Sequence, residues 1–365
     1  MDSNSSSNLD SPHETTGGGA GDVELLAELT RQIQAIESQI GRRIVGQHQV
    51  VRELLVAILA GGHALLVGVP GLAKTMLIRT LARAVDVGFR RIQFTPDLMP
   101  ADVTGTDVLA EDRATGERAF RFVPGPIFAN IVLADEINRT PPKTQAALLE
   151  AMQERQVTVG GRRHELPLPF FVLATQNPLD QEGTYPLPEA QMDRFLLQIQ
   201  VDYPSQQDEL RIAMESEFAD ESDIEQVIDG QRLTVFQQLV QRLPMSEVVA
   251  DYAVRLTRAT RPDGTEASDS VKRYVRWGAG PRASRHLVLA AKAWAAMEGR
   301  SQATATDVQA VAKSVLRHRV RTNFAAEADG ITTESFLDEL IGSTSPIQGE
   351  GANGLGSVLR SSATR

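Results

Sequence analysis

The sequence predicts an α/β core with a parallel five-stranded sheet flanked by helices, followed by an all-helical domain. Between about residues 63 and 204, short apolar runs alternate with segments of helical periodicity. The runs are continuous, which is typical of strands buried on both faces of a parallel sheet. They span residues 64–67, 91–94, 131–134, 170–174 and 195–201. Helices between successive strands imply right-handed crossovers and therefore an open sheet.

Helical periodicity dominates on either side of this region. From Val23 to Ala60 apolar residues recur at helical spacing, and after Pro204 the pattern becomes helical again. The segment Ser205–Asp208 has the pattern of a capping box at a helix start. Further helices are expected near residues 206–218, 232–241, 246–259, 284–299 and 304–318.

These patterns divide the chain into four predicted segments. Residues 1–21 and 342–365 are rich in small and polar residues, and they hold too little apolar surface to fold, so we expect disordered tails. Residues 22–204 form the predicted α/β core. Residues 205–341 form the predicted helical domain.

The composition narrows the class of protein. The chain has 365 residues and a net charge of −10, and this acidic balance argues against a nucleic-acid partner. It has no Cys, and its six His are scattered, so we expect neither disulfides nor a transition-metal site. The uncharged stretch 54–73 is about as long as a membrane span, but Gly61-Gly62 and Pro70-Gly71 break it. With no secretory signal at the N-terminus, we expect a soluble, cytoplasmic protein without membrane insertion.

A glycine-rich loop between the first predicted strand and a helix carries the first chemical signal. Residues 68–75 are close to the pattern G-x-x-x-x-G-K-[ST] of a phosphate loop. Glycines let backbone N–H groups close around phosphate oxygens, and the helix N-terminus adds its positive dipole end. Lys74 would reach the β- and γ-phosphates of ATP, and the Thr75 hydroxyl would ligate Mg²⁺. The candidate ATP-binding residues here are Gly68, Val69, Pro70, Gly71, Leu72, Ala73, Lys74, Thr75 and Met76.

This loop departs from the general pattern at one position, because Ala73 replaces the last glycine. Such a relaxed pattern is weak alone, and an ordinary Gly-Pro turn is the alternative. The interpretation as a phosphate loop therefore depends on partners elsewhere in the chain.

Two predicted strands end in polar residues that could be those partners. One strand is followed by Asp135 and Glu136, and the run 170–174 by Asn177. Ligands of open α/β sheets bind beyond the carboxyl ends of the strands. Asp135 would hold Mg²⁺ through its waters, Glu136 would polarise the attacking water, and Asn177 would hold that water or the γ-phosphate. The alternatives are a solvated turn at Asp135-Glu136 and a turn-forming Asn before Pro178.

Two arginines beyond this edge of the sheet are further catalytic candidates. Arg194 lies just before the last predicted strand, and Arg282 follows Gly280-Pro281 in the helical domain. A guanidinium brought to the γ-phosphate stabilises the charge that develops during transfer. Either arginine alone could equally form a surface ion pair.

The order and wording of these motifs resemble those of the AAA+ ATPases, and in particular of the MoxR family. The resemblance covers about residues 24–325. Within it, the motif that includes Gly46 and Gln47 resembles the family's adenine-side motif, and the Ala73 variant of the loop is usual there. The matching segments are Ile44–Gln47, Gly68–Thr75, Leu133–Arg139, Thr175–Pro178, Glu189–Phe195 and Gly280–Arg282.

The resemblance implies a Mg²⁺-dependent ATPase that forms a homo-oligomeric, most often hexameric, ring. Residues 22–204 would be its nucleotide-binding core and residues 205–341 its lid. Arg194 would act in trans on a neighbour's ATP, with Arg139 as a second candidate at the interface, and Arg282 would act in cis. Inserted hairpins are implied near residues 102–122 and 156–167, and Gly160-Gly161 independently indicates a hairpin turn in the second.

The resemblance also implies a role as a chaperone-like remodeller or activator of partner proteins, which often carry von Willebrand factor A domains. A nucleic-acid-stimulated motor is an alternative, although the acidic balance and the lack of an added DNA-binding domain count against it. A chelatase-like motor subunit is another alternative. A nucleotide-sensing scaffold without turnover is disfavoured by intact Glu136, Asn177 and Arg194.

Overall fold

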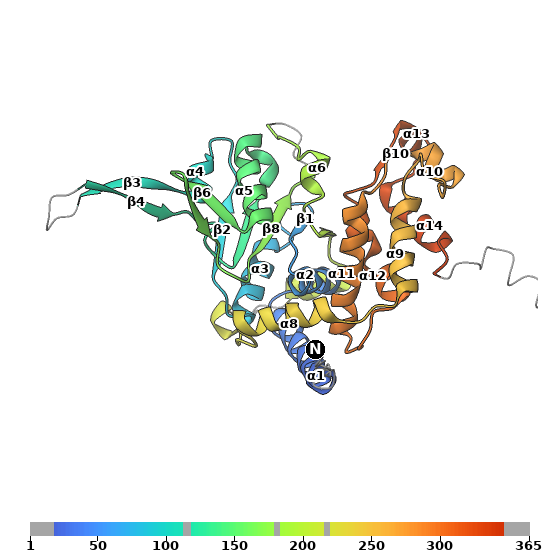
Figure 1. Cartoon of the computed structure of the whole chain (residues 1–365), viewed down its shortest axis with the longest axis horizontal. Helices are drawn as coiled ribbons and strands as arrows, with labels where there is room; N and C mark the ends of the chain where they lie inside the picture. Colours follow the sequence, from blue (N-terminus) through green and yellow to red (C-terminus); the bar gives the residue numbers. More distant parts are fainter. Residues whose placement is uncertain (1–17, 112–117, 179–182, 215–219, 347–365) are drawn as a thin grey trace, which may run out of the picture.

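The apolar runs of the core form one sheet of five parallel strands (Figure 1), as the sequence predicts. The strand order is β2-β5-β8-β1-β9, so β1 lies between β8 and β9. The computed structural model describes residues 18–111, 118–178, 183–214 and 220–346. The five strands are β1 (Ala64–Val67), β2 (Phe89–Gln93), β5 (Ile131–Asp135), β8 (Phe171–Gln176) and β9 (Leu197–Gln200).

Both faces of the sheet are covered, which explains the continuous apolar runs. Neighbouring residues of one strand belong to different apolar clusters, as Leu65 and Leu66 do. The larger cluster joins α1, α2 and α3 to the helices of the lid, and the smaller one includes α5. These helices span Gly18–Gly41 (α1), His48–Leu59 (α2), Lys74–Ala84 (α3) and Pro142–Glu154 (α5). Because α1 begins at Gly18, the last four residues of the predicted tail 1–21 are helical; residues 1–17 lie outside the described part.

The uncharged stretch 54–73 folds as the end of α2, a turn, β1 and the phosphate loop. None of the described helices combines the length and the apolar composition that a membrane span requires. At the start of β1, the buried His63 ring bonds to two other elements. Its Nδ1 accepts the Val172 N–H at 3.0 Å, and its Nε2 lies 3.1 Å from the Met152 carbonyl oxygen. The ring is therefore held as the neutral tautomer that carries its proton on Nε2.

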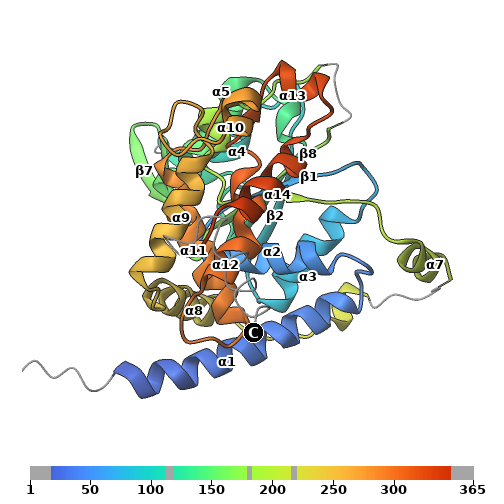
Figure 2. The ribbon, with the colours of Figure 1, turned by 90° about the vertical axis from the view of Figure 1, so that its right-hand side faces the viewer.

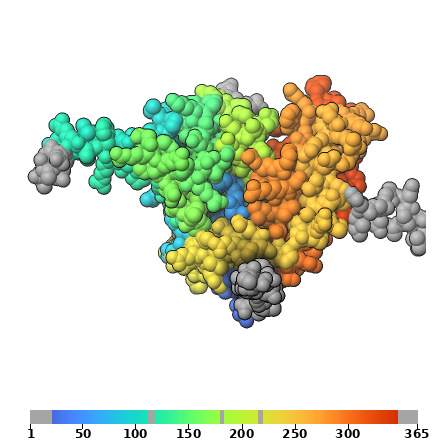
Figure 3. Space-filling view, viewed as in Figure 1, coloured from blue at the N-terminus to red at the C-terminus, as the bar shows by residue number. Residues whose placement is uncertain are grey.

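Two hairpins form near residues 102–122 and 156–167, and the first of them projects from the core (Figures 1 and 3). The first follows the short helix α4 (Pro100–Thr104) and pairs β3 (Gly105–Glu111) with β4 (Arg118–Pro124); the predicted residues 112–117 lie outside the described part. The second pairs β6 (Gln156–Val159) with β7 (Arg162–Glu165). Gly160 and Gly161 form its turn with φ values of 56° and 78°, which only glycine adopts readily. The Phe122 and His164 rings stack 3.8 Å apart and join the two hairpins.

The helical domain packs beside the core. It also contains a small two-stranded sheet that was not predicted from the sequence. The strands β10 (Val275–Trp277) and β11 (Arg321–Thr322) pair antiparallel. The predicted helices are confirmed as α7 (Gln206–Met214), α8 (Gly230–Arg242), α9 (Glu247–Ala259), α11 (Pro281–Met297) and α12 (Ala305–Leu316). The further elements are α6 (Glu189–Met192), α10 (Asp269–Tyr274), α13 (Phe324–Ala328), α14 (Thr333–Ser343) and the 3-10 turns at Ile137–Arg139 and Glu221–Asp223.

The helix α7 stands apart from the other helices (Figure 2), and none of its residues is buried. Its first turn has the predicted capping contacts, in which the Asp208 N–H donates to Ser205 Oγ at 3.2 Å and Ser205 Oγ donates to the Asp208 carboxylate at 2.7 Å.

Candidate nucleotide site

The structure brings three of the predicted motifs together in one cavity of about 480 Å³ at the carboxyl ends of β1, β5 and β8. The phosphate loop, the two acids after β5 and Asn177 after β8 all contribute. The lining residues are Pro70, Gly71, Leu72, Ala73, Lys74, Thr75, Met76, Asp135, Glu136, Thr175 and Asn177. This is the edge where ligands of open α/β sheets bind.

The phosphate loop has a backbone that two small residues make possible. A Cβ on Gly68 would lie 2.5 Å from the Val201 carbonyl oxygen, so only glycine fits where the loop leaves β1 beside β9. Ala73 has a left-handed φ of 55°, which explains why the general pattern places a glycine there. The helix α3 begins at the next residue, Lys74, so its N-terminal N–H groups face the cavity.

Lys74 reaches back over the loop that precedes it. Its ammonium donates to the Gly68 carbonyl and, at 3.2 Å, to the Val69 carbonyl. Burial lowers the pKa of Lys74, and the charges of Asp135 and Glu136 oppose that shift. The amine therefore contacts the loop and lies close enough to both carboxylates to feel their charge.

Asp135 ends β5 with both carboxylate oxygens engaged. The Thr175 hydroxyl donates to Oδ1 at 2.6 Å, and Arg91 donates to Oδ2 from Nε at 3.0 Å and from Nη2 at 2.6 Å. Thr175 comes from β8 and Arg91 from β2, the strands on either side of β5. These contacts fix the carboxylate in one orientation.

Asp135 and Thr75 are compatible with Mg²⁺ even so. Asp135 Oδ1, which accepts one hydrogen bond, has a second lone pair that can accept a hydrogen bond from a metal-bound water, and the Thr75 hydroxyl is a hard oxygen ligand. The described residues contain no group of three or more acidic or His side chains that could hold a metal ion by themselves.

Glu136 has a strained backbone, with φ 58° and ψ 48°. Such conformations cost about 1–3 kcal/mol and concentrate at functional sites. Its N–H donates to Thr175 Oγ1 at 2.8 Å, and its Oε2 accepts from Gln93 Nε2 at 2.8 Å. Arg139 Nε also lies 3.3 Å from Oε2, so Arg139 contacts the site of its own chain, and its expected interface role gains no support.

Arg194 and Arg282 lie elsewhere: neither belongs to the lining that the described residues give this cavity. Arg194 donates to the Leu149 carbonyl at 2.8 Å and lines a separate surface cavity along α5. Arg282, at the start of α11, pairs with Asp193 at 3.2 Å. Its partner is thus the residue next to Arg194, and the cis role expected for Arg282 stays a prediction.

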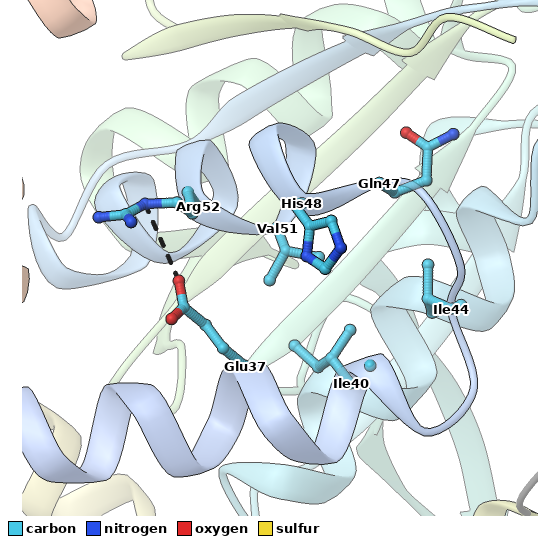
Figure 4. Close-up of a pocket in the computed structure, with 8 residues that line it drawn as sticks. Glu37, Ile40, Ile44, Gln47, His48, Val51 and Arg52 are labelled. Carbon is cyan, nitrogen blue, oxygen red and sulfur yellow. Dashed lines mark ion pairs between the residues drawn. The ribbon is translucent and has the colours of Figure 1, made fainter. Parts of the chain in front are cut away.

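The predicted adenine-side residues lie in the connection between α1 and α2. Gly46 has φ 76°, and a Cβ there would come within 2.7 Å of Asp208 on α7. Gln47 donates to the Asp202 carbonyl at 3.3 Å. Figure 4 shows Gln47 at the edge of a cavity of about 200 Å³ between α1 and α2, where Arg52 faces Glu37 at 3.9 Å. Gly46 and Gln47 are not among the described residues that line the phosphate cavity, and their role on the adenine side stays a prediction.

Three site residues were missed by reasoning from the sequence. Arg91 and Gln93 contact Asp135 and Glu136 from the edge strand β2, and Thr175 links both acids. The available signal was two polar residues, two positions apart, in a run otherwise predicted as a buried strand.

Comparisons with known proteins agree with this geometry. The family model for the "ATPase family associated with various cellular activities (AAA)" matches residues 63–197, and an AAA lid domain model matches residues 267–340. The chain is 43% identical to Chaperone MoxR1 of Mycobacterium tuberculosis over 90% of this chain and 85% of that protein. It is 33% identical to Protein MoxR of Paracoccus denitrificans over 78% and 87% of the two chains. A crystal structure of a candidate ATPase from Cytophaga hutchinsonii matches with a TM-score of 0.81 and 38% identity, over 89% of this chain and 97% of that one.

Proposed function

The chain belongs to the MoxR family of AAA+ ATPases, and we propose that it hydrolyses ATP with Mg²⁺ at the cavity described above. The observation that carries this proposal is the convergence of Lys74, Thr75, Asp135, Glu136 and Asn177 on one cavity at the carboxyl edge of the sheet. A chance phosphate-loop pattern would not bring two acids and an amide from separate strands to the same place.

Each residue then has a defined task. Lys74 and the N–H groups at the start of α3 bind the β- and γ-phosphates. Thr75 and Asp135 would hold Mg²⁺, which when bound neutralises charge on the phosphates. Glu136 orients and polarises the attacking water, while Gln93 fixes the direction of its carboxylate through the 2.8 Å hydrogen bond. Asn177 holds the water or the γ-phosphate without adding charge.

We further propose that Arg194 acts on ATP bound by a neighbouring subunit. In its own chain it lies along α5, outside the described lining of the phosphate cavity, which supports a role at the nucleotide of another subunit. We propose a closed ring, and specifically a hexamer, as the assembly that brings each Arg194 to a neighbouring site. We propose that Arg282 acts in cis on the nucleotide of its own chain, and its ion pair with Asp193 links it to the residue next to Arg194.

The ring would use ATP to remodel or activate protein clients. This proposal is supported by the 43% identical relative, which is named a chaperone. We propose partners with a von Willebrand factor A domain as the clients to test first.

The experiment measures ATP binding and steady-state hydrolysis for the wild type and two variants. Lys74→Ala is expected to lose ATP binding, and Arg194→Ala to bind ATP but lose hydrolysis by about 10³-fold or more. Mixing the two variants should restore part of the activity, because some sites then combine an intact loop with an intact arginine. If mixed rings form without recovery of activity, the trans role of Arg194 is wrong.

A further inference from the structure

The lid holds the segment between α6 and β9 through one buried arginine. Arg319, which follows α12, is only 5% exposed. Its Nε donates to Asp193 Oδ1 at 2.7 Å, and its Nη2 donates to the Asp193 carbonyl at 3.1 Å. The guanidinium also donates to the carbonyls of Phe195 and Leu196. Burying a charge costs desolvation free energy unless the charge is paired and hydrogen-bonded. An apolar side chain would pack here without that cost, so packing alone does not explain the arginine.

The surroundings keep Arg319 charged and in one orientation. Burial lowers its pKa to about 10, against the opposing charge of Asp193, so it stays protonated at neutral pH. Its Nη2 lies 2.7 Å from His286 Nδ1. Burial lowers the pKa of His286 to about 3, so this ring is neutral and can accept the hydrogen bond.

Other lid residues contact the same segment. Arg282 Nη1 binds Asp193 Oδ2 at 3.2 Å, so Asp193 is held by two arginines of the lid. Near Arg319, Arg317 donates to the Gln198 carbonyl at 3.2 Å, and His318 Nε2 lies 3.2 Å from the Phe195 carbonyl oxygen. The lid therefore contacts residues 193–198 through their backbone carbonyls and through the Asp193 side chain.

Arg194 belongs to the segment 193–198, but its side chain hydrogen-bonds to α5 and not, among the described residues, to the lid. Asp193 faces Arg319, whereas Arg194 donates to the Leu149 carbonyl on α5. The turn between them is tight, because the Arg194 N–H bonds the Gln191 carbonyl at 3.2 Å and the Phe195 N–H bonds the Met192 carbonyl at 3.0 Å. A displacement of Asp193 must therefore move Arg194 as well.

We propose that Arg319, through Asp193, is a positioning residue that sets Arg194 for catalysis at the neighbouring subunit's site. Movement of the lid in one subunit is thereby transmitted to hydrolysis in the next. The inference rests on the proposed trans role of Arg194 and adds to it the residues that hold the arginine in place. A misplacement of about 1 Å at a reacting group can cost about 10²-fold in rate. Weakening the contact between Arg319 and Asp193 should therefore lower the rate of ATP hydrolysis measurably.

The test uses mixed rings in which one protomer supplies only its arginine. The acceptor is Arg194→Ala, which has an intact phosphate loop. The donor is Lys74→Ala, which has an intact Arg194 but cannot turn over ATP itself. A second donor carries Arg319→Lys in addition: lysine keeps the charge but cannot bind Asp193 and the carbonyls together. A matched control donor carries Arg273→Lys, since Arg273 pairs with Asp329 at 2.7 Å on the exposed side of the lid.

The Arg319→Lys donor is expected to rescue the acceptor at least 10-fold less than the plain and Arg273→Lys donors, with equal incorporation into rings. Because the donor's own site is already inactive, damage to that site cannot produce this loss. A donor carrying Asp193→Asn removes the same ion pair from the core side. If the Arg319→Lys donor does not assemble into rings, this donor tests the role of the ion pair, and it should also rescue the acceptor at least 10-fold less.

Two other outcomes separate the proposals. Equal rescue by all donors would overturn the role of Arg319 and leave the trans role of Arg194 intact. Failure of the plain Lys74→Ala donor to rescue would instead overturn the trans role, and the proposed positioning with it.

Discussion

The hydroxyl of Thr175 provides a direct test of the site geometry. This side chain is 2% exposed, and its Oγ1 donates to Asp135 Oδ1 at 2.6 Å while accepting the Glu136 N–H at 2.8 Å. Thr175→Val keeps the branched shape and removes only the hydroxyl. A hydrogen bond to a charged group contributes about 1.5–3 kcal/mol, and a buried N–H without a partner costs about 1–3 kcal/mol. Since one hydroxyl makes both hydrogen bonds, we expect a decrease of about 3 kcal/mol in the free energy of unfolding.

Catalysis should respond as well, because the same hydroxyl helps to hold Glu136 at its left-handed φ of 58°. Without the hydrogen bond from its N–H to Thr175, Glu136 can relax, and we expect kcat to fall about 10-fold or more. Urea unfolding gives the stability and a phosphate-release assay gives kcat. Thr175→Ser is the matched control, since it retains the hydroxyl and should keep most of both quantities. A Thr175→Val protein with wild-type stability and wild-type kcat would refute the assigned network.

Three further predictions address separate features. The variant Ala73→Gly should have a free energy of unfolding within about 1 kcal/mol of wild type and should still bind ATP. Glycine relieves the strain of the left-handed φ but also raises the conformational entropy of the unfolded chain, and the two effects offset each other. Calorimetric unfolding and nucleotide titration measure the two quantities. Burial lowers the pKa of His63 from 6.5 to about 4. Between these pH values the unfolded chain binds a proton at His63 and the folded chain does not. Stability is therefore complete above pH 6.5 and falls as the pH drops towards 4, by about 2 kcal/mol from His63 at pH 5, which urea midpoints at pH 7.5 and 5 should reveal. Gln93→Leu should lower kcat and leave the Kd for ATP within about threefold, since it frees the Glu136 carboxylate and removes one acceptor of Arg91, while the Arg91–Asp135 contacts stay.

Much of the core could be predicted because its signals are local. Continuous apolar runs locate the strands, and a loop that must pack against a strand end and a helix start requires small residues such as Gly68. The turn at Gly160-Gly161 follows from two positive φ angles, which the residue type already suggests. These features depend on the chain within a few residues of themselves.

The hydrogen bonds that complete the site could not be predicted in the same way. Arg91 and Gln93 reach the two acids because β2 lies next to β5 with Gln93 opposite Asp135, and neither the strand order nor that register can be read from one sequence. The contact partner of Arg282 could not be predicted for a related reason. Its motif identifies the residue, but the packing of the lid against the core brings Asp193 within 3.2 Å of it.

The central claim is that Glu136 activates water for hydrolysis of ATP bound by the phosphate loop. The most direct measurement compares wild type and Glu136→Gln for both the Kd of ATP and its turnover under saturating Mg²⁺. For Glu136→Gln we expect a Kd within about threefold of wild type and a kcat at least about 10²-fold lower. Glu136→Gln protein that hydrolyses ATP at the wild-type rate would contradict it.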